Sequence, residues 1–419
     1  MSSVAAPARL RENIAALSVL QGLNYAVPLV TVPYLVRVLG PAHFGLITFA
    51  QALIIYFDLL TNYGFSFSAT RTVACCQESP EAVAHVFWRT TYAKAALMLL
   101  SAAILGVLVM AIPRFRATPL LYAASFLTVV GTVTFPVWFF QGIEQMRFIT
   151  LAQASARLLS IPALLIVVRS PADYVYAAAI QGGVPVLAGI FLAPALLRRV
   201  RSGPPRPSVS DTWAALREGW HPFVAQTGLV INSSTTTVVL GLVSGNSEVG
   251  YFGAADKVIK AMTSLLAPVA QALYPRLNAL KSRSRQLTLG LMRKAFAWAG
   301  AMALAASVAT LFLARPAGLL LWGSGFYHSI AVLRCLSPLP LLFALIDIVG
   351  VQTMLVLEMD SVLSRILFAG AVLNVGLAAV LSARFGALGA AAATVATAFM
   401  VAVSLAWRIA RVRALVTWA

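Results

Sequence analysis

Runs of apolar residues, each long enough to cross a lipid bilayer, recur along most of this 419-residue chain. A hydrocarbon core about 30 Å thick takes roughly 20 apolar residues per helix, and a helix satisfies its own backbone hydrogen bonds in lipid. We therefore predict an all-α polytopic membrane protein of about 12 transmembrane helices, six before a polar break and six after it. The predicted spans are 14–36, 43–63, 91–112, 118–140, 149–168 and 173–197, then 222–244, 250–275, 293–314, 330–354, 361–382 and 386–408.

The composition agrees with a membrane protein and excludes a soluble one. Hydrophobic residues make up 60% of the chain, charged residues 11%, and the mean hydropathy is +0.87, which is far outside the range of soluble globular domains. The net charge of +18 would suggest nucleic-acid binding in a soluble protein. Here Lys and Arg gather in short segments between apolar runs, a pattern that encodes membrane topology. The expected partner is the lipid bilayer, with no nucleic acid.

The polar break between the two sets of runs is the segment RRVRSGPPRPSVSDTWAALREG. We predict an N-terminal six-helix bundle over 1–197, a cytoplasmic linker over 198–221 and a C-terminal six-helix bundle over 222–419. Placing both termini and the linker in the cytoplasm leaves about 21 of the 31 Lys and Arg on that side. No A-x-A-like site closes the first apolar run, so it is predicted to stay as an uncleaved span.

Motifs for catalysis and for cofactor binding are absent from the sequence. There is no G-x-x-x-x-G-K-[ST] loop and no H-E-x-x-H, and the three cysteines and four histidines show no metal-ligand spacing. We therefore predict that the protein is not an enzyme, and that it has no catalytic residue, no metal and no cofactor.

Ionisable residues within the predicted spans are the candidates for function, because charge is costly in hydrocarbon unless it is paired or hydrated. Arg157, in LAQASARLLSIP, has no acidic neighbour on its own helix and needs a cross-helix partner or an anionic ligand. Asp256 lies four residues before Lys260, the favourable order for an ion pair. Such a pair leaves Lys257 without an explanation.

Three further charged positions have two open interpretations each. Arg71 follows the polar stretch TNYGFSFSAT and is either a topology charge or part of a site. Asp58 and Asp347 lie in predicted spans, where a carboxylate is either paired or titrates with a coupling ion.

Four stretches together resemble a known family. They are NIAALSVLQGLNYAVPLVTVPYLVRVLGPAHFGLITFAQALIIYFDLLTNYGFSFSATRTVA, FPVWFFQGIEQMRFITLAQASARLLSIP, LREGWHPFVAQTGLVINSSTTTVVLGL and VGYFGAADKVIKAMTSLLAPVAQALYPRL. Across about residues 10–295 the chain resembles the polysaccharide biosynthesis family of Wzx-type oligosaccharide flippases, of the multidrug, oligosaccharidyl-lipid and polysaccharide exporter superfamily. The resemblance implies two six-helix bundles around a central cavity, with alternating access. After about residue 315 it rests on hydropathy alone.

The resemblance also implies a cationic cavity suited to a pyrophosphate-linked glycan. The positions here that match charged sites of the family's motifs are Arg71, Glu144, Arg157, Asp256, Lys257 and Lys260. Many family members have Glu where Asp256 stands, which keeps the charge. We expect Arg71, Arg157, Lys257 and Lys260 to bind substrate, and Asp58, Glu144, Asp256 and Asp347 to serve ion coupling or charge pairing.

The implied function is translocation of an undecaprenyl-pyrophosphate-linked oligosaccharide repeat unit, for O-antigen, capsule or exopolysaccharide, from the cytoplasmic to the periplasmic leaflet. The expected location is a bacterial inner membrane, with a glycan polymerase and a chain-length regulator as further partners. One alternative is a cation-coupled multidrug exporter, although no acidic residue lies between Asn13 and Arg37. The others are a peptidoglycan lipid flippase, for whose two extra helices the chain has no room, and a membrane glycan polymerase or ligase.

Overall fold

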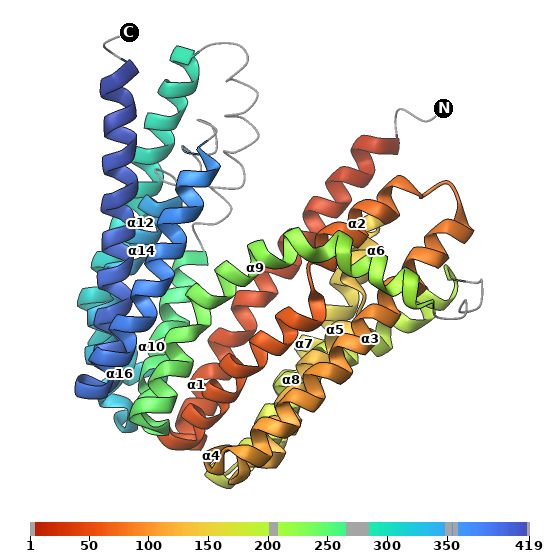
Figure 1. Cartoon of the computed structure of the whole chain (residues 1–419). Helices are drawn as coiled ribbons and strands as arrows, with labels where there is room; N and C mark the ends of the chain where they lie inside the picture. The colour runs from red at the N-terminus through yellow and green to blue at the C-terminus, as the bar shows by residue number, and fades with distance from the viewer. Residues whose placement is uncertain (1–4, 201–207, 265–284, 348–353, 355–358, 417–419) are drawn as a thin grey trace. The chain divides into compact units, whose positions relative to one another are not determined.

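The computed structural model of the protein describes residues 5–200, 208–264, 285–347, 354 and 359–416 (Figure 1). The Arg206 part of the predicted linker and the basic stretch 276–283 lie outside these residues. Within the described ranges the regular elements are helices, with no β-strand. Those of the first half are α1 (Ala5–Asn62), α2 (Phe65–Cys75), α3 (Pro80–Ala111), α4 (Pro113–Arg116), α5 (Pro119–Thr134), α6 (Val137–Gly142), α7 (Met146–Val167), η1 (Pro171–Asp173) and α8 (Tyr174–Leu197). Those of the second half are α9 (Val209–Ser244), α10 (Asn246–Ser264), α12 (Arg285–Trp322), η2 (Ser324–Phe326), α13 (Tyr327–Leu336), α14 (Leu339–Ala344) and α16 (Asp360–Val416).

Two of these helices are far longer than one bilayer crossing, and a glycine interrupts each of them. Gly40 has φ 69° within the 58-residue α1, and Gly386 has φ 56° within the 57-residue α16. Because a positive φ is incompatible with a continuing right-handed helix, each rod consists of two helices joined at the glycine. This matches the two pairs of predicted spans, 14–36 with 43–63 and 361–382 with 386–408.

The length and hydropathy of the helices confirm the prediction of an all-α polytopic membrane protein. Among the described residues, eight helical segments are long and apolar enough to cross a bilayer, and the kinked rods account for two of them. Three predicted spans coincide closely with observed helices: 118–140 with α5 and α6, 149–168 with α7, and 173–197 with α8. Residues 265–275 of the predicted span 250–275 lie outside the described part of the chain.

Contacts divide the chain into two compact units, which we describe separately. Unit 1 comprises residues 1–39 and 49–234, and unit 2 comprises residues 40–48 and 235–419. The boundary between them along the chain falls inside α9. The domain limits predicted from the sequence, 1–197, 198–221 and 222–419, stay a prediction.

Close backbone packing explains why residues 40–48 belong to unit 2. A Cβ on Gly45 would lie 1.8 Å from the carbonyl oxygen of Asn246, and a Cβ on Gly250 would lie 2.1 Å from that of Pro41. Since no real Cβ tolerates such distances, the start of α10 and the second arm of α1 approach each other only because both positions are glycine. The contact holds the arm after Gly40 against α10.

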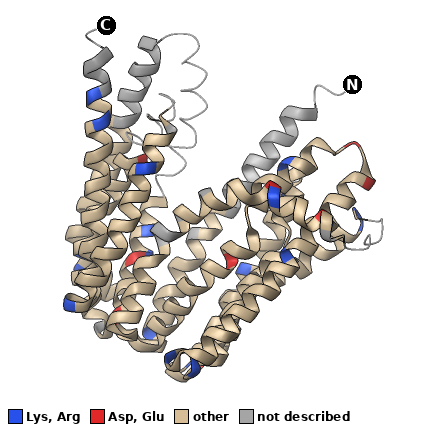
Figure 2. Cartoon of the chain, in the orientation of Figure 1, with Lys and Arg blue, Asp and Glu red and all other residues tan. Residues whose placement is uncertain are grey.

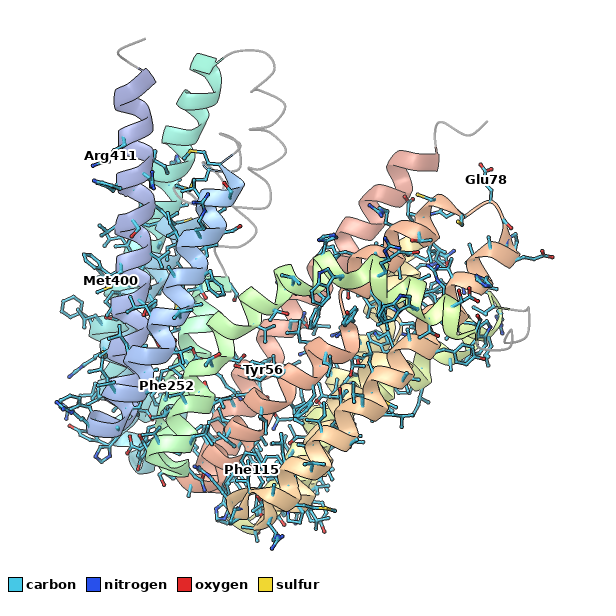
Figure 3. The ribbon with its side chains drawn as sticks, in the orientation of Figure 1. Tyr56, Glu78, Phe115, Phe252, Met400 and Arg411 are labelled. Atoms are coloured by element: carbon cyan, nitrogen blue, oxygen red, sulfur yellow. The ribbon has the colours of Figure 1, made fainter. Side chains whose placement is uncertain are left out.

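Unit 1 is built around two groups of aromatic side chains. Helix α8 packs against α5 and α7, and Figure 1 shows these elements side by side with α3. Near α4, Phe115 contacts the rings of Phe49 and Tyr122, with centroids 5.9 and 5.0 Å apart (Figure 3). The second group is a buried cluster that includes Phe87 and Phe139, whose centroids are 5.2 Å apart. Such rings fill a large volume and give the unit a core distinct from its lipid-facing surface.

The first part of α9 is fastened to α3 and to the α1–α2 junction, all within unit 1. The guanidinium of Arg89 donates two hydrogen bonds, of 3.2 and 3.0 Å, to the carboxylate of Glu218. His85 lies 3.5 Å from Asp211. The Tyr63 ring stacks on Phe223 at a centroid distance of 4.6 Å. The opening of α9 is thereby a fixed part of unit 1.

In unit 2, hydrogen bonds join α9 and α10 to α16. The Thr236 hydroxyl donates to the Asn374 side-chain oxygen at 2.7 Å, and both side chains are buried. The backbone N–H of Ala387 donates to the Glu248 carboxylate at 2.6 Å. Ala387 follows the kink at Gly386, so Glu248 satisfies an N–H at the start of the second arm of α16.

Candidate functional site

A partly buried network of polar and charged side chains joins α1, α3 and α5 in unit 1. The Asn62 side-chain N–H donates to the Asp58 carboxylate at 3.2 Å. The Lys94 ammonium donates to the Asn62 side-chain oxygen at 3.0 Å and to the Thr132 carbonyl at 2.5 Å. Lys94 is 3% exposed, and the second carboxylate oxygen of Asp58 is buried without a hydrogen-bond partner. The two opposite charges are thus linked through a neutral amide.

Arg157 lies in α7 on a polar stripe of a largely apolar helix. At 3.6 residues per turn, four polar side chains fall within about 100° of one another around the helix, those of Thr150, Gln153, Arg157 and Ser160. The Nε of Arg157 is buried without a hydrogen-bond partner, and no carboxylate of the described residues lies within salt-bridge distance of its guanidinium. The cross-helix partner that the sequence left open is therefore not found among the described residues, and the anionic ligand stays a prediction.

Arg71 and Glu144 occupy exposed positions near the ends of short helices. Arg71 lies on α2, and Glu144 lies in the turn between α6 and α7 with φ 57°. The Gln77 side chain donates to the Gly142 carbonyl at 2.6 Å and ties that turn to the end of α2. Whether Arg71 is a topology charge or part of a site stays a prediction.

The charged residues of α10 form two different arrangements in unit 2. Lys260 forms a salt bridge of 2.7 Å with Asp256, the i,i+4 pair that the sequence spacing indicates. The Lys257 ammonium lies 5.0 Å from the centroid of the Phe44 ring, in a cation–π contact. An aromatic face offsets part of the desolvation of a cation but leaves its net charge available. Lys257 therefore forms no salt bridge among the described residues, whereas Lys260 is already paired with Asp256.

Asp347 is the last residue of a π-helical turn, 345–347, that follows α14. The next residues of the chain, 348–353, lie outside the described residues. The role of Asp347 in ion coupling or charge pairing stays a prediction. So does the joint cationic cavity of Arg71, Arg157, Lys257 and Lys260.

The sequence pattern did not single out Lys94 or the neighbouring pair Arg147 and Arg199. Lys94 lies at the start of the predicted span 91–112, where it resembles an ordinary flanking charge. Arg147 and Arg199 both contact Phe148, at 4.9 and 4.5 Å from its centroid, beside the end of α8. Burial lowers the pKa of the Arg199 guanidinium, and the neighbouring Arg147 and Arg198 lower it further. Because little charge of either sign lies along the helices (Figure 2), such local groups of basic residues stand out.

Two solved structures share the fold of this chain. The chain superposes on a multidrug resistance MATE family transporter of the MOP superfamily, in its inward-facing conformation, with a TM-score of 0.70 and 18% identity, over 97% of this chain and 99% of the other. It also superposes on the lipid II flippase MurJ, in an inward closed conformation, with a TM-score of 0.72 and 11% identity, over 95% of this chain and 87% of the other. The chain therefore has the helical fold that these two membrane proteins share.

The family follows from the sequence comparisons. A family model described as polysaccharide biosynthesis protein matches residues 10–281. Two relatives both carry the name "Putative O-antigen transporter": one from Escherichia coli (strain K12) is 32% identical over 94% of each chain, and one from Shigella dysenteriae is 26% identical over 91% of this chain and 95% of its own. The chain belongs to the polysaccharide biosynthesis protein family.

Proposed function

We propose that this protein is a flippase, which moves an undecaprenyl-pyrophosphate-linked oligosaccharide repeat unit from the cytoplasmic to the periplasmic leaflet by alternating access. The observation that carries the proposal is the buried Nε of Arg157 on the polar stripe of α7, which has no hydrogen-bond partner among the described residues. Family membership and the names of the two relatives support a glycan precursor as the cargo.

The chemistry of the cargo accounts for the basic residues. A pyrophosphate that crosses hydrocarbon loses its hydration at a cost of many kcal/mol, and protein charge has to replace the lost water. A guanidinium presents a planar set of donors that matches phosphate oxygens, and its charge does not depend on pH. Arg157 in unit 1 and Lys257 in unit 2 each offer a positive charge to such an anion.

The reaction is transport without a chemical step on the cargo. The sequence has no nucleotide-binding loop and no catalytic motif, and we propose that the lipid-linked glycan leaves the protein chemically unchanged. The glycan polymerase and the chain-length regulator then act on it after transport. The protein lies in a bacterial inner membrane with both termini in the cytoplasm, as the distribution of Lys and Arg favours.

Replacing Arg157 tests the assignment in bacterial cells that depend on this protein for a surface glycan. Arg157→Gln removes the charge, and Arg157→Lys keeps it with a different geometry. We expect Arg157→Gln to reach the membrane at normal levels and to export glycan at least about tenfold less, as the loss of roughly 1.4 kcal/mol or more of cargo binding predicts. Arg157→Lys should be partly active.

Arg365→Gln is the matched control, because Arg365 is exposed on α16 and its side chain donates only to the Ser361 carbonyl of its own helix. This variant should export glycan normally. Normal export by Arg157→Gln at equal protein levels would overturn the role of Arg157 in binding the cargo.

A further inference from the structure

We propose that Lys94 is a built-in counter-cation for Asp58, so that unit 1 needs neither a proton nor a monovalent metal cation from solution at this carboxylate. Three observations on the described residues carry the proposal: the burial of Lys94 and of one Asp58 carboxylate oxygen, the hydrogen bonds that fix Lys94, and the incomplete coordination of Asp58. The proposal is independent of the cargo.

The charges of Asp58 and Lys94 are opposite and balance each other. An ionised carboxylate buried in a membrane protein needs a compensating positive charge, because its desolvation costs several kcal/mol. Among the described residues, Lys94 is the basic group that a hydrogen-bonded amide, that of Asn62, links to Asp58. The pair therefore balances itself and has no net charge when both groups are ionised.

Hydrogen bonds to two helices hold the Lys94 ammonium in place. The Lys94 ammonium is held at the carboxyl-terminal end of α5, where the carbonyl of Thr132 belongs to the last turn and has no partner within the helix. The negative end of the helix dipole favours a cation there. The amide of Asn62 accepts from Lys94 and donates to Asp58, which orients both groups. Lys94 is thereby fixed to the unit by α5 and α1 together.

One carboxylate oxygen of Asp58 is the position where an external cation would bind. The Asp58 oxygen that faces no hydrogen-bond donor is where a proton or a cation would add. Sodium-like ions need several oxygen ligands, and the ammonium of Lys94 repels a second cation nearby. While Lys94 is present, the site has no need for an external charge. When the lysine charge is removed, the carboxylate must recruit a proton or a metal cation instead.

Lys94→Met tests this inference, because it removes the charge and keeps much of the side-chain volume. We expect the wild-type melting temperature to be insensitive to sodium. We expect the variant to melt on the order of 5–10 °C lower at about pH 8 without sodium. Acidification to about pH 5.5, or addition of sodium, should restore much of the difference in this variant, and the effective treatment identifies the cation that Asp58 recruits.

The stability of Asp58→Asn should depend on pH in the direction opposite to that of Lys94→Met, because Asp58→Asn leaves Lys94 charged without a counter-ion. Its melting temperature should rise as the pH increases and the lysine becomes neutral. The double variant Asp58→Asn/Lys94→Met has neither charge. It should be more stable than the less stable single variant, insensitive to pH and sodium at this site, and active in translocation.

Ser101→Ala is the matched control. Ser101 is buried on α3, two turns after Lys94, and is hydrogen-bonded to Thr61 at 3.3 Å. Its loss should lower the melting temperature without a change in the response to pH or sodium. Should Lys94→Met fail to accumulate, recovery of protein in the double variant provides the same test.

Three results would overturn the inference. One is a Lys94→Met variant that responds to pH and sodium as the wild type does. Another is a double variant no more stable than the worse single variant. The third is a well-folded double variant that has lost translocation, since that would assign the pair to the transport cycle instead of to static charge compensation.

Discussion

Single charged residues carry most of the functional argument, and their surroundings separate them into two groups. Asp256 with Lys260, and Asp58 with Lys94, balance one another within one unit. Arg157 and Lys257 form no salt bridge with a carboxylate among the described residues. The second group is therefore the one from which we expect an anion to receive its compensating charge.

This difference predicts unequal effects at two neighbouring lysines. Lys257→Gln should lower glycan export at least about tenfold, because it removes a charge that is held in no salt bridge among the described residues. Lys260→Gln should have a smaller effect on export, because Asp256 already neutralises that lysine. Export is measured at equal protein levels in the membrane. A larger loss for Lys260→Gln than for Lys257→Gln would contradict the assignment.

The stability of Lys260→Gln gives a second reading of the same pair. The Lys260 side chain is 57% exposed, and exposed i,i+4 ion pairs contribute little. We expect the free energy of unfolding to fall by less than about 1 kcal/mol. Thermal denaturation of Lys257→Gln and Lys260→Gln measures this change. A large loss of stability in Lys260→Gln would show that the ion pair with Asp256 is structural.

At the scale of elements, local sequence signals and tertiary contacts contribute differently to what could be predicted. Hydropathy placed the spanning helices, because lipid requires each span to be long, apolar and helical. Spacing predicted the Asp256–Lys260 pair, because i and i+4 meet on any helix. The contact of Lys94 with Asn62 joins residues 32 positions apart, and the approach of Gly45 to Asn246 joins positions still more distant. Such contacts depend on how helices pack, which one sequence does not reveal.

The glycine contact between the second arm of α1 and α10 predicts a sharp steric effect. Gly45→Ala places a Cβ 1.8 Å from the Asn246 carbonyl oxygen, so the helices must separate. We expect a loss of about 1–3 kcal/mol or more, seen as reduced thermal stability and yield. Gly106→Ala in α3 is the control, because no atom lies within 4 Å of its added Cβ. Equal behaviour of the two variants would mean that the contact does not exist.

The attachment of α9 to α3 predicts a measurable coupling. Arg89→Gln, Glu218→Gln and their combination form a double-mutant cycle on the bidentate pair. We expect a coupling energy of about 1 kcal/mol, since the Arg89 side chain is mostly buried while Glu218 is partly solvated. Strictly additive effects of the two single variants would show that the pair does not fasten α9.

At the scale of the whole molecule, orientation in the membrane follows from the basic segments. We predict that the turn between α2 and α3, which contains Glu78 (Figure 3), faces the cytoplasm and that Ser247 at the start of α10 faces the periplasm. Ser247 is a suitable position for a probe on the periplasmic side, because it is exposed. The next residue, Glu248, is unsuitable, because its carboxylate accepts a hydrogen bond from Ala387. In a background without Cys75, Cys76 and Cys335, an impermeant thiol reagent added to intact cells should label Ser247→Cys and not Glu78→Cys. The reverse pattern would overturn the topology.

Translocation by the purified protein tests the central claim most directly. The protein is reconstituted in liposomes that carry an undecaprenyl-pyrophosphate-linked oligosaccharide, and the fraction of glycan reached by an impermeant glycosidase or lectin is followed in time. We predict that the wild type moves the lipid between leaflets and leaves it chemically unchanged, and that Arg157→Gln does so far more slowly at equal reconstitution. Wild-type liposomes that are no faster than protein-free ones, or glycan recovered elongated or released from its lipid, would contradict the flippase assignment.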